Sequence, residues 1–253
     1  GFQPLETSAL EYVETLGKFL PESDQPDAGI FALKDGDGEW IALRYDLTAP
    51  LSRFVAEHAQ NLGLPFRRYQ LGPVWRNEKP GPGRFREFLQ FDADTVGTAS
   101  MVADAENAAL LARAFDALGL AGQYRIAMNN RKILDGLLEK IGLGSAQTDA
   151  RAMTVMRAID KFDKFGDAGV RLLLTTGRKD DSGDFTKGAG LSDDDASRIL
   201  AFMHAGKSAR KETLEALAPL VAGSVRGEEG LRELAEIDAI LSAYALADSV
   251  VAF

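Results

Sequence analysis

The pattern of hydrophobic and polar residues predicts a mixture of strands and helices in the first part of the chain. Residues 39–44 form a short apolar segment after the turn-forming residues 34–38, as expected of a strand that follows a tight turn. Apolar side chains then recur every three or four positions from Leu51 to Leu62, which is the spacing of an amphipathic helix. Thr48 precedes this segment and is a suitable start for the helix.

Two longer extended segments follow, at residues 66–76 and 84–96. The connection between them contains two Pro and two Gly residues, so we predict an antiparallel hairpin. Further along, the same patterns predict a helix at residues 100–118, a strand at residues 124–128 and a helix at residues 131–141.

The second part of the chain is dominated by helical spacing. Helices are expected at residues 154–165, 168–175, 192–203, 211–220 and 228–245. Ser192 and the aspartates after it make a favourable helix start. Residues 177–190 contain four Gly and are predicted to be a loop, and no strand pattern is evident in this half. These patterns together predict an α+β fold, with a mixed core at residues 1–147 and an all-α domain at residues 148–248.

Composition narrows the class of protein without identifying it. The 253 residues are 45% hydrophobic, yet no apolar run approaches the ~18–20 residues that would span a bilayer. Without Cys, the chain has no disulfide, thiolate nucleophile or Cys-based zinc site, and two His exclude a His-rich metal centre. The formal net charge of −9 is unusual for a protein that binds nucleic acid.

The second strand of the predicted hairpin has one polar face. Side chains alternate between the two faces of a strand, so one parity collects the following residues: Arg84, Arg86, Phe88, Gln90, Asp92 and Asp94. This row is compatible with a solvated sheet face. A ligand pocket is favoured over that reading, because the opposite parity already supplies apolar side chains for packing. Arg76 also ends the partner strand at the loop, beside Glu78, and an arginine there can bind a phosphate in bidentate fashion.

Residues 66–97 resemble motif 2 of class II aminoacyl-tRNA synthetases. The pair Arg76-Asn-Glu78 is followed, after the Pro- and Gly-rich loop, by Gly83-Arg-Phe-Arg-Glu-Phe-Leu-Gln90, which is similar to the form found in histidyl-tRNA synthetases. The resemblance implies a class II antiparallel sheet flanked by helices, with an all-α insertion domain. It also implies that Arg76 binds the ATP α-phosphate and acts in catalysis, with Glu78 and Arg84 at the adenine and the outer phosphates.

A second segment, Leu43-Arg-Tyr-Asp-Leu-Thr-Ala-Pro50, is similar to the segment of the same family that holds the α-amino group of histidine. Asp46 and Thr48 offer a carboxylate and a hydroxyl, which are the acceptors that an ammonium needs. Read without the resemblance, either residue is also a good helix cap.

The family pattern implies that Gln90 and Asp94 line the histidine pocket together with Asp46 and Thr48. Arg86 is expected as an additional pocket residue. No residue is assigned as a metal ligand, and Mg²⁺ is expected to accompany ATP. The implied reaction is the ATP-dependent activation of histidine to histidyl-adenylate, followed by transfer to tRNA(His).

The resemblance further implies a cytoplasmic homodimer and a helical domain that contacts the tRNA acceptor stem. Ser8 stands where the family usually has Pro near the dimer-related strand. The later arginine segments, motif 3 and the anticodon-binding domain of the family are not found in the sequence, so the chain resembles a fragment and is expected to be inactive alone. An alternative is a synthetase-like regulatory subunit of ATP phosphoribosyltransferase, which shares the core fold.

Overall fold

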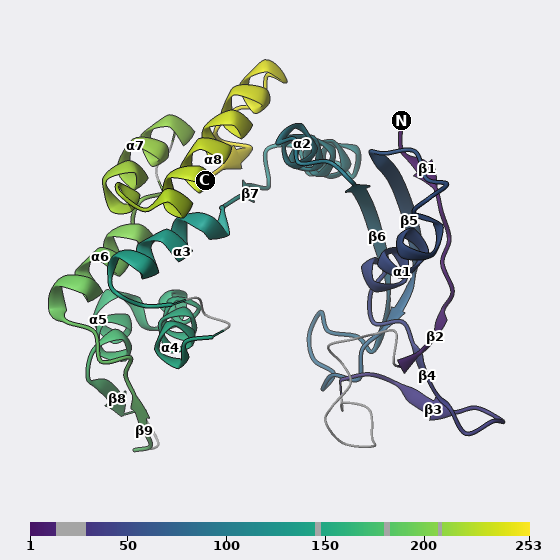
Figure 1. Cartoon of the computed structure of the whole chain (residues 1–253), viewed down its shortest axis with the longest axis horizontal. Coiled ribbons are helices and arrows are strands. Elements are labelled where there is room, and N and C mark those ends of the chain that lie inside the picture. The colour runs from purple at the N-terminus through teal and green to yellow at the C-terminus, as the bar shows by residue number, and fades with distance from the viewer. Residues whose placement is uncertain (14–28, 145–147, 180–182, 207–208) are drawn as a thin grey trace. The chain divides into compact units, whose positions relative to one another are not determined.

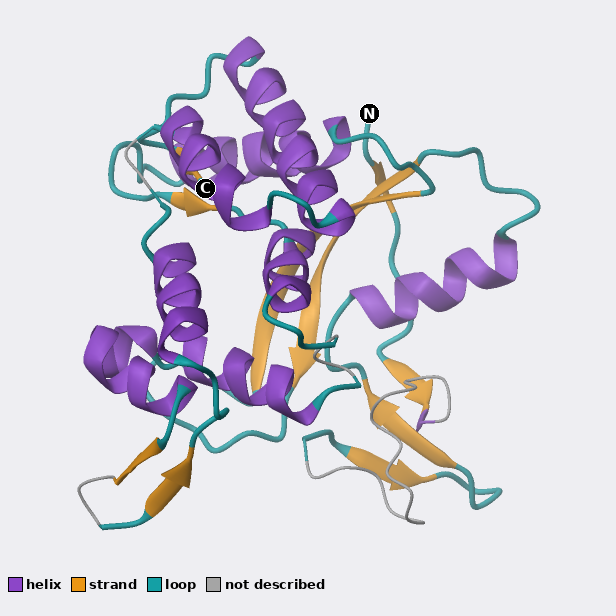
Figure 2. Ribbon diagram, turned by 60° about the vertical axis from the view of Figure 1, so that its left-hand side comes forward, coloured by secondary structure: helices purple, strands orange, loops and turns teal. Residues whose placement is uncertain are grey.

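The computed structural model describes residues 1–13, 29–144, 148–179, 183–206 and 209–253. The chain divides into two compact units, residues 1–99 and residues 100–253, whose elements are drawn in Figure 1 and Figure 2. Both strands and helices are present, so the predicted α+β class is confirmed.

The centre of the first unit is the predicted antiparallel hairpin. Strand β5 (Phe66–Trp75) pairs with β6 (Glu87–Val96) over ten residues, from Phe66 opposite Val96 to Trp75 opposite Glu87. A short strand β1 (Gln3–Pro4) pairs in parallel with β5 on its other edge. Figure 1 shows the two long strands running side by side with β1 next to β5.

A second small sheet and one helix complete this unit. Strands β2 (Leu10–Tyr12), β4 (Trp40–Leu43) and β3 (Ala32–Lys34) are antiparallel, in the order β2-β4-β3. Helix α1 (Thr48–His58) follows β4 directly, as the apolar spacing predicted. Arg44, between β4 and α1, donates from Nε to the carbonyl of Pro73 and from Nη1 to that of Thr7, and so ties the two sheets together.

The polar face of the β5–β6 hairpin is covered, as the expected pocket requires, but the apolar face is not. Arg68, Gln70 and Val74 of β5 are buried. The apolar side chains of the other face are exposed instead, with Leu71 at 60%, Leu89 at 69% and Phe91 at 55%. The prediction that this apolar face provides the packing is therefore wrong for this structure. The reason is that residues 44–48 and 7–8 pack on the polar face, where their carbonyl groups accept hydrogen bonds from buried arginines.

The second unit is mainly helical. Its elements are α2 (Val102–Ala117), β7 (Ile126–Ala127), α3 (Arg131–Lys140), α4 (Ala150–Ile159), α5 (Phe162–Leu174), β8 (Gly177–Lys179), β9 (Phe185–Lys187), α6 (Asp193–Met203), α7 (Arg210–Val221), α8 (Val225–Ala243) and β10 (Val251–Ala252). Strands β7 and β10 pair in parallel. The predicted cap of α6 is confirmed, because the Ser192 side chain accepts a hydrogen bond from the backbone N–H of Asp195.

Two details of the helical part differ from the prediction. The expected helix at residues 154–165 is instead split, since α4 ends at Ile159 and α5 begins at Phe162 and continues across a kink at Gly166. The expected loop at residues 177–190 contains the antiparallel hairpin β8–β9. Gly177 permits this hairpin, because it has φ of +103° and a Cβ there would lie 2.4 Å from the carbonyl oxygen of Thr186.

Helix α3 belongs to both hydrophobic cores of this unit. Leu134, Leu137 and Leu138 pack with α4, α5 and α6, whereas Ile133 packs with α2, α7 and α8. The predicted domain boundary after residue 147 lies inside this compact unit, and the division into residues 1–147 and 148–248 stays a prediction. Among the described residues, no helix combines the length and the apolar character needed to cross a membrane.

Replacing Gly136 by alanine is expected to destabilise the second unit by about 1–3 kcal/mol, the usual cost of overpacking. Helices α3 and α8 cross here so closely that a Cβ on Gly136 would lie 2.5 Å from the Cα of Gly227. This clash outweighs the gain in helix propensity, which is at most about 1 kcal/mol. Urea unfolding followed by circular dichroism measures the change, with Glu236→Ala on the exposed side of α8 as control. Equal unfolding midpoints for Gly136→Ala and the wild type would contradict the close crossing.

Candidate active site

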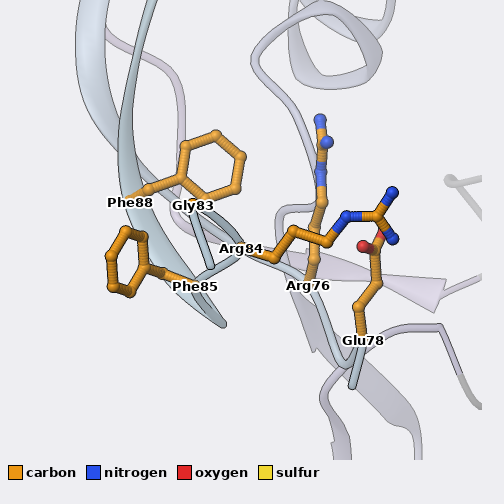
Figure 3. Close-up of a pocket in the computed structure, with 6 residues that line it drawn as sticks. All are labelled: Arg76, Glu78, Gly83, Arg84, Phe85 and Phe88. Carbon is orange, nitrogen blue, oxygen red and sulfur yellow. The ribbon is translucent and has the colours of Figure 1, made fainter. Parts of the chain in front are cut away.

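The end of the β5–β6 hairpin forms a cavity of about 430 Å³. Its wall consists of two arginines, one carboxylate, two phenylalanine rings and a glycine: Arg76, Glu78, Gly83, Arg84, Phe85 and Phe88. Figure 3 shows the guanidinium groups of Arg76 and Arg84 and the carboxylate of Glu78 on one side, with the two rings on the other. Such a cavity combines cations for phosphate with flat apolar surfaces for a heterocyclic base.

Arg76 is held by aromatic rings. Its guanidinium carbon lies 4.4 Å from the ring centre of Tyr45 and 5.1 Å from that of Phe88. Its Nε donates a 3.4 Å hydrogen bond to the Tyr45 carbonyl, and its backbone N–H bonds to the carbonyl of Arg86. These contacts restrict the side chain. Its two terminal nitrogens are not used by them and can bind an anion in bidentate fashion.

The other two loop arginines are placed differently. Arg84 closes the turn through paired backbone hydrogen bonds with Gly81 and lines the cavity. Arg86 does not line it, although it was expected as an additional pocket residue. Its Nε donates to the Glu78 carbonyl over 3.3 Å, and its guanidinium carbon lies 5.9 Å from the Phe31 ring centre. Arg86 thus supports the base of the loop, and a role toward ligand stays a prediction.

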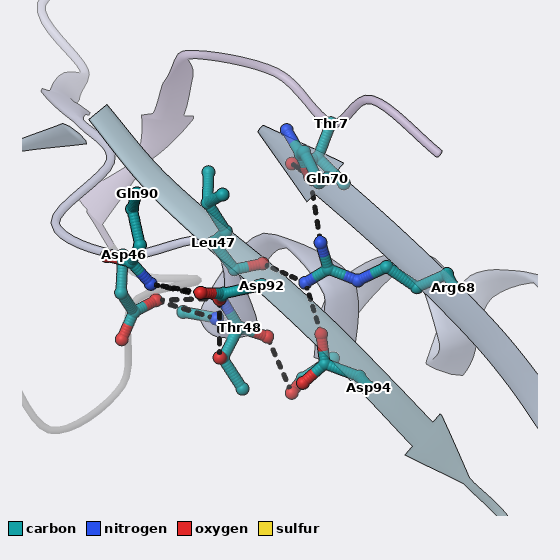
Figure 4. A network of polar contacts seen from close by, with 11 residues as sticks. Thr7, Asp46, Leu47, Thr48, Arg68, Gln70, Gln90, Asp92 and Asp94 are labelled. Atoms are coloured by element: carbon teal, nitrogen blue, oxygen red, sulfur yellow. Dashed lines mark hydrogen bonds and ion pairs between the residues drawn. The ribbon is translucent and has the colours of Figure 1, made fainter. Parts of the chain in front are cut away.

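A second group of polar side chains lies on the same face of β6, beyond the cavity (Figure 4). Asp46 Oδ1 accepts hydrogen bonds from the backbone N–H groups of Thr48 and Ala49, at 3.1 and 2.9 Å. Asp46 therefore caps α1, which was the alternative role considered from the sequence. Both bonds use one oxygen, so the carboxylate keeps an acceptor for a ligand. Thr48 Oγ1 lies 3.5 Å from Asp92 Oδ2.

Gln90 and Asp92 form a fixed pair. The Gln90 Nε2 donates to both carboxylate oxygens of Asp92, at 2.8 and 2.9 Å. The Gln90 Oε1 is buried and has no hydrogen-bond partner within the described part of the chain. A buried acceptor without a partner costs free energy, so it is well suited to receive an N–H from a bound ligand.

Asp94 is the third carboxylate of this group, and its surroundings change its pKa. Burial raises the pKa of Asp94 above its usual value, and the neighbouring carboxylates of Asp92 and Asp46 raise it further. The Arg68 guanidinium opposes this shift, with Nη2 2.8 Å from Asp94 Oδ2. Three carboxylates at one place favour a cationic ligand such as an ammonium group.

The structure thus brings Arg76, Glu78 and Arg84 together in one cavity, and Asp46, Thr48, Gln90 and Asp94 in a second group. Phe88 and Gln90 lie on one face two residues apart, which is a separation of about 7 Å. A ligand in the arginine-lined cavity and a ligand beside Gln90 would therefore be adjacent. Among the described residues, no three His, Asp or Glu side chains are grouped to hold a metal ion.

Sequence reasoning did not assign Phe85, Phe88, Asp92 or Arg68 to the site. Phe88 and Asp92 stand in the polar row that drew attention to β6, so the alternation of faces was enough to include them. Arg68 lies on the other strand, directly opposite Asp94. The hairpin register, which follows from the loop length, was the signal that would have found it.

The long antiparallel hairpin, with Arg76 and Glu78 before its loop and a group of carboxylates beside it, belongs to a fold of the class II aminoacyl-tRNA synthetase type. The family model described as "Histidyl-tRNA synthetase" matches residues 1–253. The chain therefore belongs to the histidyl-tRNA synthetase family.

Similar proteins agree with this family assignment. The chain is 56% identical over 252 residues to a histidine–tRNA ligase of Rhizobium meliloti (strain 1021), covering 99% of the chain and 50% of that protein. It is 55% identical over 250 residues to the histidine–tRNA ligase of Caulobacter vibrioides, covering 98% and 50%. The chain thus spans about half the length of the curated relatives that it matches.

Two solved structures share the fold. The histidyl-tRNA synthetase from Nostoc sp. PCC 7120 has a TM-score of 0.77 at 27% identity, over 99% of this chain and 52% of that one. A protein from Bacillus halodurans, described as an ATP phosphoribosyltransferase regulatory subunit/histidyl-tRNA synthetase, has a TM-score of 0.74 at 25% identity, over 99% and 58%.

Proposed function

We propose that this chain supplies the ATP and histidine sites of a histidine–tRNA ligase, which forms histidyl-adenylate and transfers histidine to tRNA(His). The observation that carries this proposal is the pairing of an arginine-lined cavity with an acidic amino-acid pocket on one face of β6. Family membership supports the choice of histidine. The proposal extends to a homodimer located in the cytoplasm.

Arg76 binds the ATP α-phosphate in this proposal, with Arg84 and Glu78 around the outer phosphates and the adenine. Asp46 and Thr48 accept the α-amino group of histidine, while Gln90 and Asp94 complete its pocket. The carboxylate of histidine then lies next to the α-phosphate and attacks it in line. The bond between the α- and β-phosphates breaks, so histidyl-adenylate forms and pyrophosphate leaves. Arg76 stabilises the negative charge that develops on the phosphate, and no protein nucleophile is needed.

Mg²⁺ would be held mainly by the phosphates of ATP. This ion keeps several water ligands and often uses only one or two protein carboxylates together with substrate phosphates. Glu78 is the carboxylate that lines the cavity and fits that limited role. When bound, the ion would neutralise phosphate charge.

ATP–pyrophosphate exchange with a panel of amino acids tests the proposal on the full-length protein that contains this chain. Exchange that depends on histidine supports it, and exchange with a different amino acid overturns the substrate. The alternative suggested by the sequence, a regulatory subunit, also forms part of the name of the Bacillus halodurans protein. Such a subunit would show histidine binding without exchange.

The helical part offers a place for tRNA phosphates. A cavity of about 230 Å³ between α4, α5 and the β8–β9 hairpin is lined by three cations and two hydroxyls, among other residues: Arg157, Lys161, Lys187, Thr154 and Thr186. A second basic group in the sequence, Lys207, Arg210 and Lys211, is less suitable. Within it, Arg210 is buried in ion pairs with Asp238 and Asp248, and Lys207 lies outside the described residues.

Replacing Arg157 and Lys161 together by alanine is expected to weaken tRNA charging while histidine-dependent exchange stays within twofold. The slope of log(kcat/KM) for tRNA against log salt should become shallower by roughly two, since two phosphate contacts are lost. The double variant Arg198→Ala/Lys211→Ala, at exposed positions of α6 and α7, is the matched control. Identical salt slopes for the two double variants would contradict a phosphate site in this cavity.

A further inference from the structure

Arg68 is the largest fully buried side chain of the described residues that carries a charge. It lies on β5, opposite Asp94 in the hairpin register, and is 0% exposed. A guanidinium loses much hydration free energy on burial, and contacts of its N–H groups offset that loss. Both terminal nitrogens of Arg68 have such contacts, whereas its Nε has no hydrogen-bond partner among the described residues. The identity of those partners indicates what the residue does.

The Arg68 guanidinium contacts both sides of the amino-acid pocket (Figure 4). Its Nη2 lies 2.8 Å from Asp94 Oδ2 on β6 and donates a 2.8 Å hydrogen bond to the carbonyl of Leu47. Leu47 is 0% exposed and stands between Asp46 and Thr48, the two residues proposed to accept the α-amino group. One planar group therefore fixes the two segments that provide the carboxylates of the pocket.

A third contact holds the guanidinium itself. Its Nη1 donates to Gln70 Oε1 over 3.2 Å, and the same oxygen accepts a hydrogen bond from Thr7 Oγ1 at 3.2 Å. Because Arg has a rigid fork of donors, these bonds define its orientation as well as its position. A lysine could supply the charge but only a single point of attachment.

The charges around Asp94 make this cation important for binding. Asp46 and Asp92 face Asp94 from the end of β4 and from β6, and Arg68 faces it from β5. Without Arg68, three carboxylates would repel each other in a half-buried site, and proton uptake would relieve the repulsion. The pocket would then offer less negative charge to an ammonium.

We propose that Arg68 is a positioning residue of the histidine pocket, which holds Asp94 and the 46–48 segment in their binding arrangement. This inference rests on the proposed function, because it assumes that these carboxylates face the amino-acid substrate. Arg68 is fully buried, so it acts on the substrate through Asp94 and through the backbone at Leu47.

Steady-state exchange by the full-length protein tests the proposal. Arg68→Leu is expected to raise KM for histidine by about 10- to 100-fold, the loss typical of a hydrogen bond to a charged group. KM for ATP should change by less than about threefold. Arg67→Leu is the matched control, since Arg67 is the preceding residue on the opposite face of β5 and lies over the Phe2 ring. A purely structural role would alter both Michaelis constants, and unaltered constants in folded Arg68→Leu would overturn the proposal.

The pH profile separates the charge of Arg68 from its geometry. Ionised Asp94 binds substrate, so kcat/KM for histidine falls as pH decreases through the Asp94 pKa. Loss of the Arg68 cation removes the influence that lowers this pKa, so the low-pH limb should move to higher pH. Arg68→Lys should keep the low-pH limb near the wild-type position. It should reverse only part of the increase in KM for histidine that Arg68→Leu causes. An unmoved limb in Arg68→Leu would overturn the proposal.

An NMR titration of Asp94 gives a readout that does not need substrate. The carboxyl ¹³C signal, assigned by its loss in Asp94→Asn, should titrate at higher pH in Arg68→Leu than in the wild type. If Arg68→Leu does not fold, Arg68→Gln takes its place in the titration and the kinetics. If the wild type activates a different amino acid, the proposed function fails, and the Arg68 variants are scored on that amino acid instead. Equal Asp94 titrations would show that Arg68 does not govern this carboxylate.

Discussion

Replacing Arg76 by alanine in the full-length protein is expected to reduce histidine-dependent pyrophosphate exchange by roughly 2–4 kcal/mol of transition-state stabilisation. The guanidinium lines the cavity and contacts the rings of Tyr45 and Phe88, so it is oriented before the ligand arrives. Such a fixed cation acts most strongly when the α-phosphate gains charge. The loss should therefore appear in the rate constant of adenylate formation at saturating ATP, measured under single-turnover conditions.

The same side chain also contributes to packing, so folding needs its own measurement. A thermal melt of Arg76→Ala should lie within a few degrees of the wild type, because the lost contacts are a partly exposed hydrogen bond and two ring contacts. Arg113→Ala, at an exposed position of α2, is the control for removing one arginine. Activity of Arg76→Ala within threefold of the wild type would rule out the phosphate role.

Asp46→Asn should weaken histidine binding by about 1–2 kcal/mol and leave ATP binding nearly unchanged. Asparagine keeps an oxygen that can accept the hydrogen bonds from Thr48 and Ala49, so the start of α1 is preserved. Only the charge is lost, and a charge-assisted hydrogen bond to the ammonium becomes a neutral one. Isothermal calorimetry with each ligand measures the difference.

Asp46→Ala separates the two roles of this residue. It removes both the cap and the charge, so it should lower the melting temperature as well as the affinity for histidine. Asp35→Asn is a control in the same unit, because the Asp35 side chain also accepts backbone hydrogen bonds but lies in the exposed turn before β4. Equal losses of affinity for ATP and histidine in Asp46→Asn would indicate a change of structure instead of a pocket effect.

The sequence predicted the β5–β6 hairpin closely because its signals are local. The Pro- and Gly-rich connection identified the turn, and the strand limits at residues 66 and 96 agree with the structure. The same alternation placed Gln90 and Asp94 on one face. Helices α1 and α6 were also predicted from local spacing and, for α6, from the cap at Ser192.

What the sequence did not predict depends on distant contacts. The burial of Arg68 follows from hydrogen bonds to Leu47 and Gln70, and no pattern within β5 reveals that the Leu47 carbonyl will be there. The β8–β9 hairpin has strands of three residues, too short and too polar for a period of two to stand out. Its formation depends on the close approach of Gly177 to Thr186.

The covered polar face and the exposed apolar face of the β5–β6 hairpin predict two kinds of mutational phenotype that alternate along each strand. At positions 68, 70, 72 and 74, and at their partners 94, 92, 90 and 88, substitutions change the pocket and its support. At Leu71, Leu89 and Phe91 they change the water-facing apolar surface instead. A saturation scan that records activity and soluble yield separately should therefore show activity loss at even positions and altered yield at odd ones.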